Sequence, residues 1–135
     1  MSLVTTLGGY SIDAAGVRHQ LPVILNPSNL ITEKSIERVS CAGRGVVVLK
    51  NTPSPEIGPE KLELYVDSGN FLLMLGVNDE DGDYCVRTIT NETMSNDLIA
   101  IMGEKYPATA VTRDIDLVRA AFSEFAQSGD VRGCR

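Results

Sequence analysis

The sequence predicts an α+β fold, an antiparallel sheet of four to six strands with a helix in the N-terminal half and an amphipathic C-terminal helix packed on the sheet. Runs of β-branched and aromatic residues between positions 46 and 90 are separated by short turn clusters, which favours antiparallel neighbours. Apolar residues at 115–126 recur with the period of a helix. A length of 135 residues suits a single domain covering 1–135.

The N-terminal 25 residues contain two β-prone pieces, 3–7 and 21–25, and either could be an edge strand. We interpret Gly8 and Gly9 between them as turn residues. Thr32 is then the expected N-cap of a first helix over about 33–42, since Ile31 and Ile36 have the spacing of a hydrophobic staple. Gly43 and Gly45 are expected to end that helix.

The middle of the chain reads as a series of strands. The pattern predicts a buried strand at 46–49, a proline-containing loop at 51–60, and a three-stranded meander formed by strands 62–66, 71–77 and 84–90 with turns at 67–70 and 79–83. The segment 96–102 fits a strand or a short helical turn, and we favour a strand over 98–102. A turn at 103–105 and an extended segment at 108–111 are expected to follow.

The last helix has the clearest pattern in the chain. Thr112 or Asp114 can cap its start, and Gly129 is expected to end it in the left-handed conformation. One side of the helix should face the main core, and it consists of Ile115, Val118, Phe122, Phe125 and Ala126, with Leu117 and Ala121 extending it.

Composition excludes several classes of function. A hydrophobic fraction of 43% with 22% charged residues is ordinary for a globular protein, so we expect no membrane partner. A net charge of −6, with the twelve basic residues scattered singly, argues against nucleic acid as a partner. The first residues lack the features of a signal peptide, so we expect a cytoplasmic location.

Few residues suit catalysis or metal binding. His19 is the sole histidine and we expect it to be a solvated surface residue, so neither a catalytic triad nor a histidine-pair metal site is indicated. Three cysteines without paired spacing suit reduced thiols. We expect Cys41 and Cys85 in the core and Cys134 exposed. The sequence therefore indicates no enzyme, no cofactor and no metal.

Asp79, Glu80, Asp81 and Asp83 make the turn at 79–83 the densest charge in the chain. The order of these residues does not fit a helix–loop–helix calcium site, since strands flank the turn. The main interpretations are a solvated hairpin turn, or a patch that binds a basic partner and fixes its register, and calcium binding is the third and least favoured.

The order of motifs over about 32–131 resembles one known family. The segments that carry the resemblance are 62–76, Asp81-Gly82-Asp83, Gly103-Glu104, Tyr106-Pro107, Phe122-Ser123-Glu124-Phe125 and Ser128-Gly129-Asp130. Together they resemble the first-described immunity-protein family of bacterial polymorphic-toxin and contact-dependent inhibition systems. The resemblance implies a non-catalytic cytoplasmic protein that binds and neutralises a cognate toxin domain, commonly a nuclease or deaminase, and so protects the producing cell.

Three alternatives stay open beside this expectation. The chain could be a small-ligand or regulatory binding module, for which a deep apolar pocket under the last helix would speak and a packed sheet–helix interface would count against. An enzyme would need a cleft that brings His19 together with two carboxylates. A homodimer through a sheet edge is compatible with either kind of binding protein.

Overall fold

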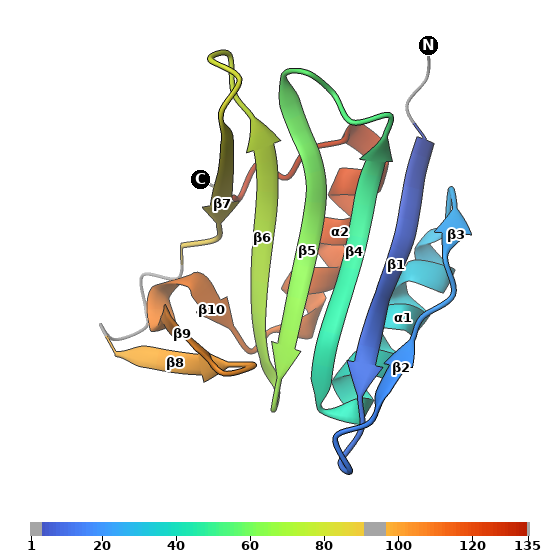
Figure 1. Ribbon diagram of the computed structural model, residues 1–135, viewed down its shortest axis with the longest axis vertical. Helices are drawn as coiled ribbons and strands as arrows, with labels where there is room; N and C mark the ends of the chain where they lie inside the picture. Colours follow the sequence, from blue (N-terminus) through green and yellow to red (C-terminus); the bar gives the residue numbers. More distant parts are fainter. Residues whose placement is uncertain (1–3, 91–96, 135) are drawn as a thin grey trace.

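The computed structural model describes residues 4–90 and 97–134, and most of its strands form one antiparallel sheet that two helices cover on one face (Figure 1). The strands of this sheet are β1 (Val4–Ile12), β2 (Arg18–Gln20), β3 (Ile24–Leu25), β4 (Arg44–Thr52), β5 (Gly58–Asp67), β6 (Asn70–Asn78), β7 (Tyr84–Thr88) and β10 (Val111–Thr112). The helices are α1 (Asn29–Ala42) and α2 (Ile115–Ser128). This arrangement confirms the predicted α+β class and the two predicted helices.

The sheet has the strand order β10-β6-β5-β4-β1-β2, with β3 paired to β1 and β7 paired to β6. The predicted meander is therefore present as β5, β6 and β7, and β4 extends it at one side. In the described ranges, the sheet has five strands of five or more residues, a number within the expected four to six. Three short strands of two or three residues bring the total to eight. One edge is formed by β2 and β3, and the other by β7 and β10.

Strand β1 corrects two expectations. It lies inside the sheet between β4 and the short edge strands, and it runs straight through Gly8 and Gly9, which are therefore not turn residues. Gly9 has φ 135°, and a Cβ there would collide with the carbonyl oxygen of Val46 on β4. Glycine at this position permits a close approach of two strands, a use that local sequence cannot distinguish from a turn.

Helix α1 begins earlier than expected. The hydroxyl of Ser28 accepts a hydrogen bond from the N–H of Ile31 at 3.2 Å, so Ser28 is the N-cap and Thr32 is not. Thr32 lies in the first turn, where its own hydroxyl donates to the Ser28 carbonyl at 3.1 Å. Both residue types favour caps, and the earlier one starts the helix. Gly43 ends α1 as predicted, whereas Gly45 belongs to β4.

Helix α2 matches its prediction closely. Asp114 is the N-cap, since its Oδ1 accepts from the N–H groups of Asp116 and Leu117, and Gly129 follows the helix with φ 75° and ψ 12°. The buried side consists of Val118, Ala121, Phe122 and Phe125. Ala126, expected on this side, is exposed.

The main core fills the space between the helices and the sheet. Its largest fully buried members are Phe122, Phe125, Leu7, Leu21, Ile36, Leu49, Leu62, Leu64, Leu73 and Leu75. Two cysteine predictions are wrong: Cys41 is exposed on α1, and Cys134 is buried because the C-terminal tail folds back to form a bridge with Ile89. Cys85 is half-buried and packs against the core, close to its prediction.

A separate two-stranded hairpin covers one corner of the other face of the sheet (Figure 1). It consists of β8 (Leu98–Ile101), a predicted strand, and β9 (Glu104–Pro107). The turn falls at Met102 and Gly103. Glu104 and Lys105 were expected in the turn but belong to β9. The segment Ala108–Ala110, expected to be extended, is a 3-10 helix. Asn96 and Leu3, at the ends of two expected strands, lie outside the described residues.

Hairpin and sheet share a second apolar cluster, opposite the main core. It is built from Leu72, Ile101, Ala110 and Val111, with Tyr65, Met74, Ile99, Met102 and Tyr106 packed around them. In the described part of the chain, neither helix has the length and apolar content that crossing a membrane requires.

Candidate functional site

The acidic turn between β6 and β7 is held by one of its own carboxylates. Asp79 Oδ1 accepts hydrogen bonds from the backbone N–H groups of Asp81 and Asp83, each at 2.9 Å. The Asp79 N–H donates to the Asp83 carbonyl at 2.9 Å and closes the turn. Asp79 is half-buried, whereas Glu80, Asp81 and Asp83 are exposed. The structure thus separates one turn-forming carboxylate from three that face solvent.

Exposed apolar side chains lie beside these three carboxylates. Tyr84 and Val86, on the edge strand β7, are 47% and 50% exposed. Tyr84 lies over Gly76, where a Cβ would collide with the phenol ring. The loop after β4 reaches the same end of the sheet, since Asn78 Nδ2 donates to the Pro55 carbonyl at 2.8 Å (Figure 1).

That loop adds an exposed Ile57 and an exposed Glu56 to the same end. We call the surface formed by Glu56, Ile57, Glu80, Asp81, Asp83, Tyr84 and Val86 the acidic end. Aromatic and apolar groups ringed by charge are typical of protein-binding surfaces.

A polar network occupies the uncovered face of β5. The Tyr65 hydroxyl donates to Glu63 Oε2 at 3.1 Å, and Lys61 Nζ lies 3.4 Å from Glu63 Oε1. Burial, with the nearby charge of Glu63, raises the pKa of Tyr65 to about 12. Both effects disfavour a phenolate, so Tyr65 is a neutral hydrogen-bond donor over the physiological range.

His19 is exposed, as expected, and has a partner that sequence reasoning missed. Its Nε2 lies 2.9 Å from Asp13 Oδ2 across the turn between β1 and β2. This hydrogen bond, followed by one from the Val17 N–H, lowers the pKa of Asp13. The pair does not line the pocket beside α2 that is described below, and no group of three potential ligands among the described residues could hold a metal ion.

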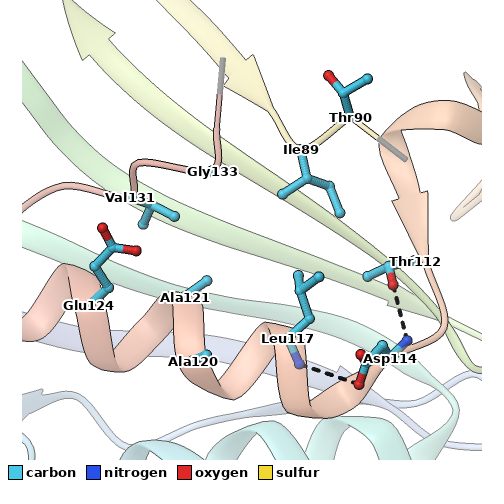
Figure 2. A pocket seen from close by; sticks show the side chains of 10 residues that line it. All are labelled: Ile89, Thr90, Thr112, Asp114, Leu117, Ala120, Ala121, Glu124, Val131 and Gly133. Atoms are coloured by element: carbon cyan, nitrogen blue, oxygen red, sulfur yellow. Dashed lines mark hydrogen bonds between the residues drawn. The ribbon is translucent and has the colours of Figure 1, made fainter. Parts of the chain in front are cut away.

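A pocket with a volume of about 540 Å³ lies beside α2 (Figure 2). It is enclosed by the end of β7, by β10, by the outward side of α2 and by the C-terminal tail, and its lining consists of Ile89, Thr90, Thr112, Asp114, Leu117, Ala120, Ala121, Glu124, Val131 and Gly133. This volume falls in the range of small-molecule sites. Its residues come from four separate segments, so no local sequence pattern reveals it.

The polar groups of this pocket are partly engaged already. Asp114 caps α2 through Oδ1, and the Thr112 hydroxyl accepts a hydrogen bond from the Asp114 N–H at 3.1 Å. Glu124 Oε2 accepts from the N–H of Arg132 at 3.0 Å and lies 3.3 Å from its Nε. In each carboxylate these contacts use one of the two oxygens.

The packed interface under α2 counts against a ligand-binding module whose pocket lies under that helix. The interface between α2 and the sheet is packed, since Val118, Phe122 and Phe125 are at most 1% exposed. The pocket lies beside the helix, on the side of Leu117, which is 39% exposed. Leu117 was expected to extend the core-facing side, but it lines the pocket instead. An apolar residue at the margin of the core-facing side of α2 is the sequence feature that comes closest to indicating this pocket.

Comparison with known proteins gives one family and one solved structure. The crystal structure of a hypothetical protein from Neisseria gonorrhoeae is similar to this chain, with a TM-score of 0.85 and 27% sequence identity, over 96% of this chain and 91% of the other. Among curated proteins, no relative matches. The model of a family described as "Family of unknown function (DUF6911)" matches residues 4–134. The chain therefore belongs to this family of unknown function.

Proposed function

We propose that this protein is a non-catalytic binding protein that neutralises a cognate bacterial toxin domain, and that the acidic end is its partner-facing surface. The observation that carries the proposal is the combination, at one end of the sheet, of exposed carboxylates with the exposed side chains of Tyr84, Val86 and Ile57. The resemblance to immunity proteins supplies the kind of partner, a nuclease or deaminase domain acting in the cytoplasm of the producing cell.

Charge supports this choice of partner. A toxin that processes nucleic acid needs a basic active-site surface, and a chain with a net charge of −6 is attracted to such a surface over a distance. The backbone of the turn is also pre-organised by Asp79, so the turn need not fold when the partner arrives. No enzymatic step is part of the proposal, since His19 and Asp13 are exposed and do not line the pocket beside α2.

The test is the affinity for the protein encoded by the gene immediately upstream. Its C-terminal domain is titrated by calorimetry with the wild type and with the variant Glu80→Lys/Asp81→Lys. Reversal at these two positions changes only exposed side chains, because the turn is held by backbone groups and by the Asp79 carboxylate. We expect the affinity to fall by about a hundredfold.

The matched control is Glu104→Lys/Asp116→Lys, which makes the same change in net charge on β9 and α2. It should alter the affinity by no more than about threefold, the range of long-range attraction at physiological salt. Equal losses in the two variants would remove the acidic end from the interface. No binding by the wild-type protein would refute the proposed partner.

A second candidate function is a small-ligand binding module, which the pocket beside α2 favours. It needs no partner protein, so the two candidates are separated by experiments on the isolated chain.

A further inference from the structure

We infer that the pocket beside α2 is a binding site for a small aliphatic amine, a ligand with an apolar body and a protonated amino group. This inference rests on the second candidate function and names its ligand class. It follows from the shape of the pocket, from the nature of its walls and from the sign of its charged groups.

The walls are apolar and continuous with the core. Ile89, Ala121 and Val131 are at most 8% exposed and form fixed surfaces, while Leu117 points from α2 into the space toward Ile89 (Figure 2). Ala120 is exposed and leaves room that a larger side chain would fill. An alkyl chain placed here would remove its own surface and that of Leu117 from water.

The charged residues that line the pocket, Asp114 and Glu124, are both acidic. Arg132 does not line the pocket, but it contacts Glu124 Oε2 through its N–H and its Nε. The two carboxylates are ten residues apart on α2, which corresponds to about 15 Å along a helix. An amino group can therefore approach a carboxylate at either end of the apolar wall, whereas Asp114 would repel a carboxylate or phosphate ligand and the charge of Glu124 is partly offset by Arg132.

Hydroxyl groups complete the polar lining. Thr112 already accepts a hydrogen bond from the Asp114 N–H, and Thr90 lies on the opposite side of the pocket from α2 (Figure 2). Because an ammonium group has three donors and no acceptor, carboxylate and hydroxyl oxygens are suitable partners for it.

The test is a titration of the full chain with hexylammonium at neutral pH, followed by the NMR signals of the methyl groups of Leu117, Ile89 and Val131. We expect saturable shifts of these signals. The neutral analogue 1-hexanol should bind about tenfold more weakly, since it keeps the alkyl chain and loses the charge. Absence of saturable shifts with hexylammonium, or equal affinity for hexanol, would overturn the inference.

Two sets of variants locate the site. Asp114→Asn/Glu124→Gln removes both charges and keeps the cap, because asparagine caps helices as well as aspartate does. We expect it to bind hexylammonium and hexanol equally. Ala120→Leu fills the pocket with a good helix former and should abolish binding of both.

The matched control is Ala126→Leu, the same substitution at an exposed position of α2 that does not line the pocket. It should bind hexylammonium like the wild type. Binding unaffected by Ala120→Leu would place the amine elsewhere and refute the site. The titration contains no partner protein, so its failure would leave the proposed toxin binding untouched.

Discussion

The two faces of the sheet are built on different principles. The covered face carries an almost purely apolar core against α1 and α2, with Phe122 and Phe125 fully buried. The other face carries the hairpin of β8 and β9 at one corner and the Tyr65–Glu63–Lys61 network on β5. Stability therefore depends mainly on the covered face, and the hairpin adds a smaller apolar cluster on the other face.

The largest expected loss of stability comes from a substitution in the core of the covered face. Phe122→Ala should lower the free energy of unfolding by about 4 kcal/mol, because it removes a fully buried ring and leaves a cavity. Urea denaturation followed by circular dichroism measures the change.

Leu117→Ala on the same helix is the control. Its side chain is 39% exposed, so the loss should be about 1 kcal/mol or less. Similar losses for the two variants would contradict the view that α2 has one structural and one open side.

Adjacent glycines on β1 sharpen the comparison. Gly9→Ala should destabilise the protein by about 2 kcal/mol or more, since the residue has φ 135° and its new Cβ would meet the Val46 carbonyl. Gly8→Ala meets no atom within 4 Å and should be neutral or stabilise by up to about 1 kcal/mol. Thermal unfolding of both variants decides the point, and a neutral Gly9→Ala would show that β1 and β4 can separate at little cost.

The cap of α2 gives a smaller effect. Asp114→Ala should cost about 1 kcal/mol, because two backbone N–H groups lose their acceptor. Asp114→Asn should stay within a few tenths of a kcal/mol of the wild type, since it retains that acceptor. Chemical denaturation compares the two, and an equal loss in both would assign the effect to charge instead of to the cap.

The smallest expected effect on stability comes from Tyr65 on the uncovered face, and it appears only at high pH. Tyr65 has a folded pKa of about 12 against an ordinary value of 10.0, so folding favours its neutral form. Its contribution to stability is complete below pH 10 and is lost as the pH rises from 10 to 12. Absorbance of the phenolate should show a late titration step near pH 12 that Tyr65→Phe removes. Persistence of that step in the variant would assign it to another tyrosine.

Local periodicity explains which parts of the fold were predictable. The alternation in β5 and β7, the continuous apolar run in β6 and the helical spacing in α2 are properties of neighbouring residues, and these elements were confirmed. Some errors were local, such as the cap of α1, and others arose where distant segments decide. Gly9 is explained by its approach to Val46, and Cys134 is buried because the tail pairs with Ile89.

The same reasoning applies to the candidate sites. The acidic turn was visible in the sequence, but the distinct role of Asp79 required the backbone hydrogen bonds of the turn. The pocket beside α2 was not visible, because Ile89, Thr112, Leu117 and Val131 meet only in three dimensions. The interior position of β1 likewise depends on its pairing with β4, residues 44–52, far along the chain.

The folded-back tail makes the reactivity of Cys134 a measure of tail opening. Burial, with the nearby charges of Asp130 and Glu124, raises the pKa of the Cys134 thiol to about 11, so it should resist alkylating reagents while the tail is paired. Exposed Cys41 provides an internal reference in the same molecule. The ratio of their labelling rates therefore reports how often the tail detaches from Ile89, and with it how often the wall formed by Val131 and Gly133 opens.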